Sequence, residues 1–235
     1  MPVTTPDMQV APTGAAAVAL HGRPPGRHLP AMLSRRGLLG LAVSLPAAAA
    51  AGAAPLPAAA PIEALHQAIL GIMRAGRTSS FAQRMQTLTP TVRAAYDLPF
   101  ILSKAVGPRF AGFPPQAQSE LLEAFTAFTV ASYVANFDDY HGERFDILPQ
   151  TRHVGGDEVV QTLLVQSGGE PLKLDYVVRR QEGGWKIIDV LLNGSISRVA
   201  VQRSDFRALL GSGDAGPLIA SLRGKLARLA AGQKD

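Results

Sequence analysis

Between residues 61 and 142 the apolar side chains recur at spacings of three and four, which is the period of an amphipathic helix. The pattern predicts four helices here, from Pro61 to Gly76, from Ser80 through Val92, over 98–106 and from Pro114-Pro115 to about Asp139. Pro90 is expected to split or bend the second helix, because a proline interrupts the hydrogen-bond ladder. Gly142 ends this helical part of the chain.

After Gly142 the period of the apolar positions changes to two, which is typical of β-strands. The pattern predicts four strands, over residues 144–152, 158–167, 172–181 and 184–193. The separators are short and rich in glycine, so neighbouring strands should pair antiparallel as a meander. The fourth strand is apolar on both faces and is therefore expected to be central or covered twice. Two more helices are predicted, over about 198–210 and 217–230.

The order of these elements indicates a fold class. Helices come first, an antiparallel meander follows, and helices close the chain, which favours an α+β fold over a parallel α/β one. We expect the helices to pack on one face of a curved four-stranded antiparallel sheet. Such an arrangement can enclose an apolar cavity between its two layers.

A different pattern precedes the first helix. Arg35 and Arg36 stand before a short apolar run, Leu38 to Leu45, and small residues with several Ala-x-Ala options follow. This is the three-part pattern of a signal peptide, and its apolar run is shorter than the roughly 20 residues that cross a bilayer. The arginine pair partly matches a twin-arginine signal, so export by that route and by another both remain open.

The leader divides the chain into three parts. Residues 32–60 are assigned to the signal peptide, with cleavage within 47–60, and residues 61–235 to one exported domain. Residues 1–31 are rich in Pro, Gly and Ala without a helical or strand period, and are expected to be disordered. Because Met32 stands directly before the signal, it is a candidate for the true start, in which case residues 1–31 are not translated. The predicted location is the periplasm.

Composition excludes several classes of function. The formal charge of +5 comes largely from the leader, and residues 56–235 hold 19 basic and 17 acidic side chains. A nearly neutral domain is a poor candidate for binding nucleic acid through its phosphates. The chain has no cysteine, which excludes disulfides, thiolate metal sites, a cysteine nucleophile and a lipoprotein anchor.

Two polar clusters are candidates for chemistry. Asp138, Asp139, Glu143 and Asp146 could bind a cation at the end of the long helix, although a solvated loop is favoured, and no metal site is predicted. His141 and His153 flank the first strand, but two histidines make a weak metal site, and a surface role is favoured for both.

Asp189 lies within the most apolar strand, where a carboxylate must be paired or protonated. One interpretation is a general base in a steroid-isomerase-like cavity. The favoured one is an ion pair with Arg198 or Arg203.

The long helix carries an unusual mixture of side chains. Aromatic residues alternate with small polar ones, among them Thr126, Thr129, Ser132 and Asn136. Core packing and a ligand-lined face explain this mixture equally well.

Three stretches resemble one known family, the toluene-tolerance (Mla-type) periplasmic phospholipid-binding proteins. They are FAQRMQTLTPTVRAAYDLPF, FPPQAQSELLEAFTAFTVASYVANFDDYHGE, and WKIIDVLLNGSIS followed by QRSDF. Together the resemblance covers roughly residues 62–212. The YDLPF segment and one extra residue within Gly194–Arg198 make the chain more similar to the family's branch associated with hopanoid biosynthesis.

The resemblance implies an NTF2-like fold whose cavity holds acyl chains, with no catalytic residues and no cofactor. It also implies a lipid carrier that moves phospholipid or hopanoid between an inner-membrane ABC-transporter complex and an outer-membrane complex. The alternative is an NTF2-like cavity enzyme acting on a hydrophobic small molecule. For the carrier, the predicted lipid-binding residues are Phe125, Phe128, Tyr133, Tyr176, Val178 and Val190.

Overall fold

A computed structural model describes residues 56–210 and 213–233 of the chain. Residues 1–31, for which disorder is predicted, and nearly all of the proposed signal peptide therefore lie outside the described residues. None of the described helices is long and apolar enough to cross a membrane.

The described residues form six α-helices, a five-stranded sheet and three short 3₁₀ helices. The α-helices are α1 (Ala60–Ala75), α2 (Phe81–Ala95), α3 (Leu98–Val106), α4 (Pro115–Asn136), α5 (Arg198–Leu209) and α6 (Gly216–Ala230). The strands are β1 (Arg144–Val154), β2 (Asp157–Val165), β3 (Leu172–Gln181), β4 (Gly184–Leu192) and β5 (Ile196–Ser197). The 3₁₀ helices are η1 (Pro57–Ala59), η2 (Gly76–Thr78) and η3 (Gly107–Gly112).

The predicted α+β class and the antiparallel meander are confirmed, but the predicted number of strands is wrong. The sheet has the order β1-β2-β3-β4-β5, with each neighbouring pair antiparallel. The fifth strand forms because Asn193 and Gly194, both with positive φ, turn the chain back on β4. Ile196 then pairs with Leu192. Two residues are too few to show a period, so the pattern alone did not reveal this strand.

Two helices differ from the prediction. Helix α2 runs through Pro90 without a break. Helix α4 ends at Asn136, three residues before the predicted Asp139, because Phe137 leaves the helical conformation. The Arg84 guanidinium of α2 donates to the carbonyl oxygens of Val134 and Asp138, at 3.4 and 3.3 Å, and so satisfies this helix end.

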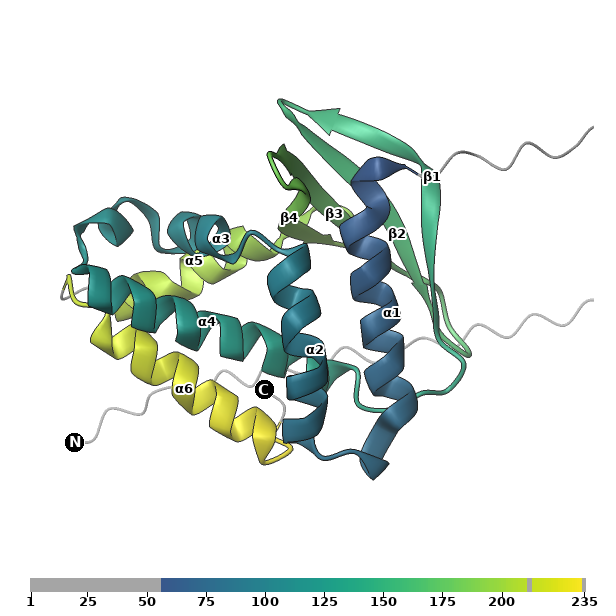
Figure 1. Ribbon diagram of the computed structural model, residues 1–235, viewed down its shortest axis with the longest axis horizontal. Coiled ribbons are helices and arrows are strands. Elements are labelled where there is room, and N and C mark those ends of the chain that lie inside the picture. The colour runs from purple at the N-terminus through teal and green to yellow at the C-terminus, as the bar shows by residue number, and fades with distance from the viewer. Residues whose placement is uncertain (1–55, 211–212, 234–235) are drawn as a thin grey trace, which may run out of the picture. The chain divides into compact units, whose positions relative to one another are not determined.

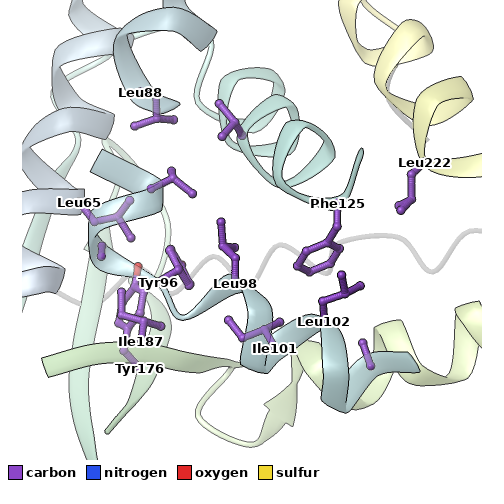
Figure 2. Close-up of a cluster of buried hydrophobic side chains, with 14 of the residues drawn as sticks. Leu65, Leu88, Tyr96, Leu98, Ile101, Leu102, Phe125, Tyr176, Ile187 and Leu222 are labelled. Carbon is purple, nitrogen blue, oxygen red and sulfur yellow. The ribbon is translucent and has the colours of Figure 1, made fainter. Parts of the chain in front are cut away.

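Helices α1, α2, α3 and α5 contact the sheet, whose inner face carries Leu174, Tyr176 and Val178, and α6 packs on α4 (Figure 1). Against the same face, α1 buries Ile62 and Leu65, which are fully inaccessible to solvent. Figure 2 shows how the buried side chains of α2, α3, α4 and the sheet converge on a common core. On the opposite face, β3 buries the Asp175 carboxylate, which pairs with Arg152 and Lys173 at 3.1 and 3.7 Å.

Candidate functional site

A cleft of about 520 Å³ lies between the helices and the inner face of the sheet. Its walls come from α3, α4, the beginning of α5 and the part of the sheet formed by the end of β2, the beginning of β3 and the end of β4. This volume falls within the range of roughly 300–1,000 Å³ that is typical of small-molecule sites. The cleft is the main candidate for a binding site in the described part of the chain.

The deep walls of the cleft are apolar. Its buried aliphatic and aromatic lining includes Leu98, Ile101, Phe125, Leu164 and Leu174. Five of the six residues predicted to contact a ligand line it, namely Phe125, Phe128, Tyr133, Tyr176 and Val190. The sixth, Val178, does not line the cleft. It is fully buried opposite Ile187 in the part of the sheet that α1 covers.

The small polar residues of α4 that face the cleft are bonded within their own helix. Thr129 Oγ1 donates to the Phe125 carbonyl at 2.9 Å, and Ser132 Oγ donates to the Phe128 carbonyl at 2.8 Å. Asn136 Nδ2 donates to the Ser132 carbonyl at 2.9 Å. Since these bonds use their donor groups, the side chains offer the cleft fewer polar contacts than their composition suggests. The mixed pattern of the long helix is therefore compatible with an apolar cleft.

A pair of tyrosine hydroxyls, Tyr96 and Tyr133, is hydrogen-bonded inside the cleft. Tyr96 lies where α2 passes into α3, and the next residue fixes this junction on the sheet. The Asp97 amide donates to the Ile187 carbonyl of β4 at 2.9 Å, and the Asp97 carboxylate accepts from the Phe100 amide at 3.0 Å. Burial raises the pKa of both tyrosines, so the hydroxyls stay protonated.

A second buried polar pair lies beside the first. His66 Nε2 of α1 and the Tyr176 hydroxyl of β3 are 3.1 Å apart, and the imidazole stacks on Phe145 with a centroid distance of 4.0 Å. Burial lowers the pKa of His66 to about 4, so the ring is neutral near pH 7. Sequence analysis missed His66 and Tyr96, because each is an isolated polar residue within an apolar pattern.

Asp189 has a structural role that differs from the predicted ion pair. Its carboxylate accepts hydrogen bonds from the Ser197 hydroxyl, from the Val199 amide at 3.1 Å and from the Val190 amide at 2.8 Å. Ser197 Oγ in turn accepts from the Ala200 amide and caps α5. Within the described residues, no ion pair joins this carboxylate to Arg198 or Arg203. Asp189 therefore fastens the beginning of α5 to β4.

The rim of the cleft is polar. Arg198 and Gln202 stand on it at the beginning of α5, and Asp139 and His141 stand on it after α4. The nearest carboxylate oxygens of Asp139 and Glu143 are each 3.8 Å from a nitrogen of His141. In residues 56–210 and 213–233, no group of three or more acidic or histidine side chains has the arrangement of a metal site.

Comparison with known proteins gives the chain a family. A family model described as MlaC protein matches residues 63–224. The chain belongs to the MlaC family. No curated protein matches the chain.

The fold of this MlaC-family chain is also similar to a solved structure. That structure is the phospholipid-binding protein from Ralstonia solanacearum in complex with a phospholipid, determined at 1.53 Å resolution. The TM-score is 0.64 at 20% sequence identity, and the match covers 74% of this chain and 98% of the other. At this identity the likeness shows a shared fold.

Proposed function

We propose that this MlaC-family protein is a lipid carrier that holds the acyl chains of its cargo in the cleft. The observation that supports the proposal is the contrast between the apolar deep walls and the polar rim. An amphipathic lipid presents the same two chemistries in the same order. In this proposal the NTF2-like arrangement of helices over a bent sheet shields the chains from water.

The free-energy cost of exposing acyl chains to water explains why a lipid needs a carrier to cross an aqueous compartment. Each methylene removed from water contributes about 0.8 kcal/mol, so two chains of about 16 carbons represent roughly 25 kcal/mol. A protein that lowers this barrier needs an apolar cleft and no reactive group. The hydrogen bonds that hold Asp189 give its carboxylate a structural task, which favours the carrier over a cavity enzyme that uses this residue as a base.

We propose a place for the carrier between two membranes. Proteins of the MlaC family are periplasmic, and the leader pattern of residues 32–60 fits export to that compartment. In this scheme the protein exchanges lipid with an inner-membrane ABC-transporter complex and with an outer-membrane complex. The cargo is a phospholipid or, as the hopanoid-associated branch suggests, a hopanoid.

We further propose that cleavage of the signal peptide leaves Leu56 or an earlier residue as the first residue of the exported protein. Ala58 and Ala59 are 2% and 1% exposed and pack in the hydrophobic core. Cleavage after residue 60 would remove both side chains, whereas cleavage within the Ala-rich stretch before Leu56 would keep them. Sequencing the N-terminus of the exported protein should therefore find a first residue at or before Leu56. A first residue after Ala59 would contradict this boundary.

The carrier proposal is tested by native mass spectrometry with lipid extraction. The full chain is produced with its leader and recovered from the periplasm of a Gram-negative host. We expect about one phospholipid or hopanoid molecule per chain, and the extract identifies which class is bound. Protein that is lipid-free, and that also takes up no lipid from vesicles of phosphatidylglycerol and phosphatidylethanolamine, would overturn the proposal.

A further inference from the structure

Polar groups form a row from the rim of the cleft into its interior. Arg198 is exposed at the rim, and the hydrogen-bonded hydroxyls of Tyr96 and Tyr133 lie inside the cleft. Tyr176 also lines the cleft, but its hydroxyl is paired with His66, which does not. Tyr96 and Tyr176 are 6% and 2% exposed, so the inner part of the row is shielded from bulk water. The cleft therefore combines apolar walls with a few shielded hydroxyl groups.

The bonded tyrosines Tyr96 and Tyr133 have one hydrogen-bond donor more than the bond between them uses. Each hydroxyl carries one proton, and a bond between Tyr96 and Tyr133 uses one of the two. The remaining hydroxyl proton has no acceptor among the residues that the structure describes. A buried donor of this kind is costly unless a ligand or an ordered water accepts its proton.

The row has a charged outer part, Arg198, and an uncharged inner part, the tyrosine hydroxyls. Arg198 forms no ion pair within residues 56–210 and 213–233. Its positive charge reaches the tyrosines, since it acts to lower the pKa of both Tyr96 and Tyr133 against the larger effect of burial. Carboxylates of Asp139 and Glu143 also line the cleft, but they stand beside His141 after α4, so Arg198 on α5 is the rim group that can bind an anion. Deeper in the cleft, desolvation disfavours a charge, and a neutral acceptor such as a carbonyl oxygen suits the free hydroxyl proton.

We propose that this row recognises the polar part of a glycerophospholipid: Arg198 binds the phosphodiester, and the Tyr96–Tyr133 pair donates a hydrogen bond to an acyl ester carbonyl. The inference rests on the proposed lipid-carrier function and names its cargo. A glycerophospholipid has an anion next to neutral esters and apolar chains, and the cleft has Arg198 on its rim, the Tyr96–Tyr133 pair inside it and apolar walls around that pair. A hopanoid hydrocarbon offers neither the anion nor the esters.

The test compares two probes that differ in the carbonyl groups alone. The full chain is loaded from vesicles with equal amounts of dipalmitoyl phosphatidylglycerol and its dihexadecyl ether analogue, and the bound ratio is measured by native mass spectrometry. We expect the wild-type protein to favour the ester lipid about fivefold, as one hydrogen bond can provide. Equal loading of the two lipids would overturn the proposal while leaving the carrier function intact, whereas no loading of either would contradict the carrier function itself.

The double substitution Tyr96→Phe and Tyr133→Phe removes both hydroxyls together and should abolish the preference for the ester lipid. Replacing both partners of a hydrogen bond by similar apolar groups is nearly neutral for stability, so this variant should fold. Tyr140→Phe is the matched control, because Tyr140 lies outside the cleft. An ester preference that survives in the folded double variant would refute the role of the tyrosine pair.

The role of the cation is tested by Arg198→Gln, with Arg203→Gln on the same helix as the control outside the cleft. Dipalmitoyl phosphatidylglycerol competes here with dipalmitoylglycerol, which has the same esters but no phosphate. We expect Arg198→Gln to reduce the preference for the phospholipid about threefold to tenfold. An unchanged preference, or a wild-type protein that prefers a hopanoid hydrocarbon over the ester phospholipid, would overturn the assignment.

Discussion

Strand β3 serves two regions of the molecule that are built differently. Val178 is fully buried against the closed half, which we define as α1 and α2 with the part of the sheet that they cover. Leu174, four residues earlier on the same face, lines the cleft. Tyr176 stands between them, bonded to His66 of α1 and also lining the cleft.

The two regions differ in how their helices are composed. In the closed half, α1 buries the aliphatic side chains of Ile62, Leu65 and Ile69 completely. Helix α4 presents aromatic residues and internally bonded small polar residues, such as Thr129 and Ser132, to the cleft. From this comparison we expect most of the stability to come from the closed half, so that lipid can enter and leave the cleft without unfolding the protein.

The largest expected effect is on the stability of the closed half. Leu65→Ala should lower the free energy of unfolding by about 4 kcal/mol, because Leu65 is fully buried and its truncation leaves a cavity. The lipid bound per folded chain should not change, since Leu65 does not line the cleft. Chemical denaturation combined with lipid quantification measures both quantities. A loss of bound lipid as large as the loss of stability would contradict the division into two regions.

A smaller change in the free energy of unfolding is expected when the pH is lowered, because His66 of α1 is also buried. The pKa of His66 falls from 6.5 to about 4 on burial, so between these values the unfolded chain binds a proton that the folded chain does not. The free energy of unfolding should therefore decrease as the pH falls from 6.5 to 4, by about 3 kcal/mol from this group. His66→Gln should remove that part of the slope in denaturation curves, whereas the exposed His153→Gln should leave it unchanged. Equal slopes for wild type and His66→Gln would contradict the burial of a neutral imidazole.

Most of the fold could be predicted from the sequence because its elements are long and periodic. The predicted ranges for β3 and α5 agree with the structure to within one residue. The site was harder to predict. The alternation of apolar and polar residues along a strand shows which face of the sheet each residue occupies, but it does not show which helix covers that face. Val178 and Tyr176 lie on the same face of β3, yet only Tyr176 lines the cleft, since α1 covers the other end. The partners of Asp189 were missed because they depend on a two-residue strand, β5.

A third change should act on the cleft and spare the closed half. Phe128→Asp places a carboxylate on the wall of the cleft, where an acyl chain could not solvate it, and lipid binding should fall roughly fiftyfold. Phe128 is only half-buried, so the variant should still fold. Lipid co-purification and a thermal melt measure the two properties. The control is Phe110→Asp, a half-buried phenylalanine that does not line the cleft. Undiminished lipid in the Phe128→Asp protein would contradict the assignment of this wall.

The smallest expected effect on stability comes from removing the cap of one helix in each region, and the rate of lipid release should then distinguish the two regions. Ser197→Ala and Ser80→Ala each remove a capping hydroxyl, from α5 and from α2, and each should cost about 1 kcal/mol of stability. Ser197 also binds Asp189 and so positions Arg198 on the rim, whereas Ser80 caps a helix whose beginning lies outside the cleft. Only the Ser197→Ala variant should therefore release bound lipid faster, by severalfold, in an exchange assay with vesicles. If both variants released lipid at the same altered rate, the effect would follow overall stability, and the beginning of α5 would not act as a separate wall of the cleft.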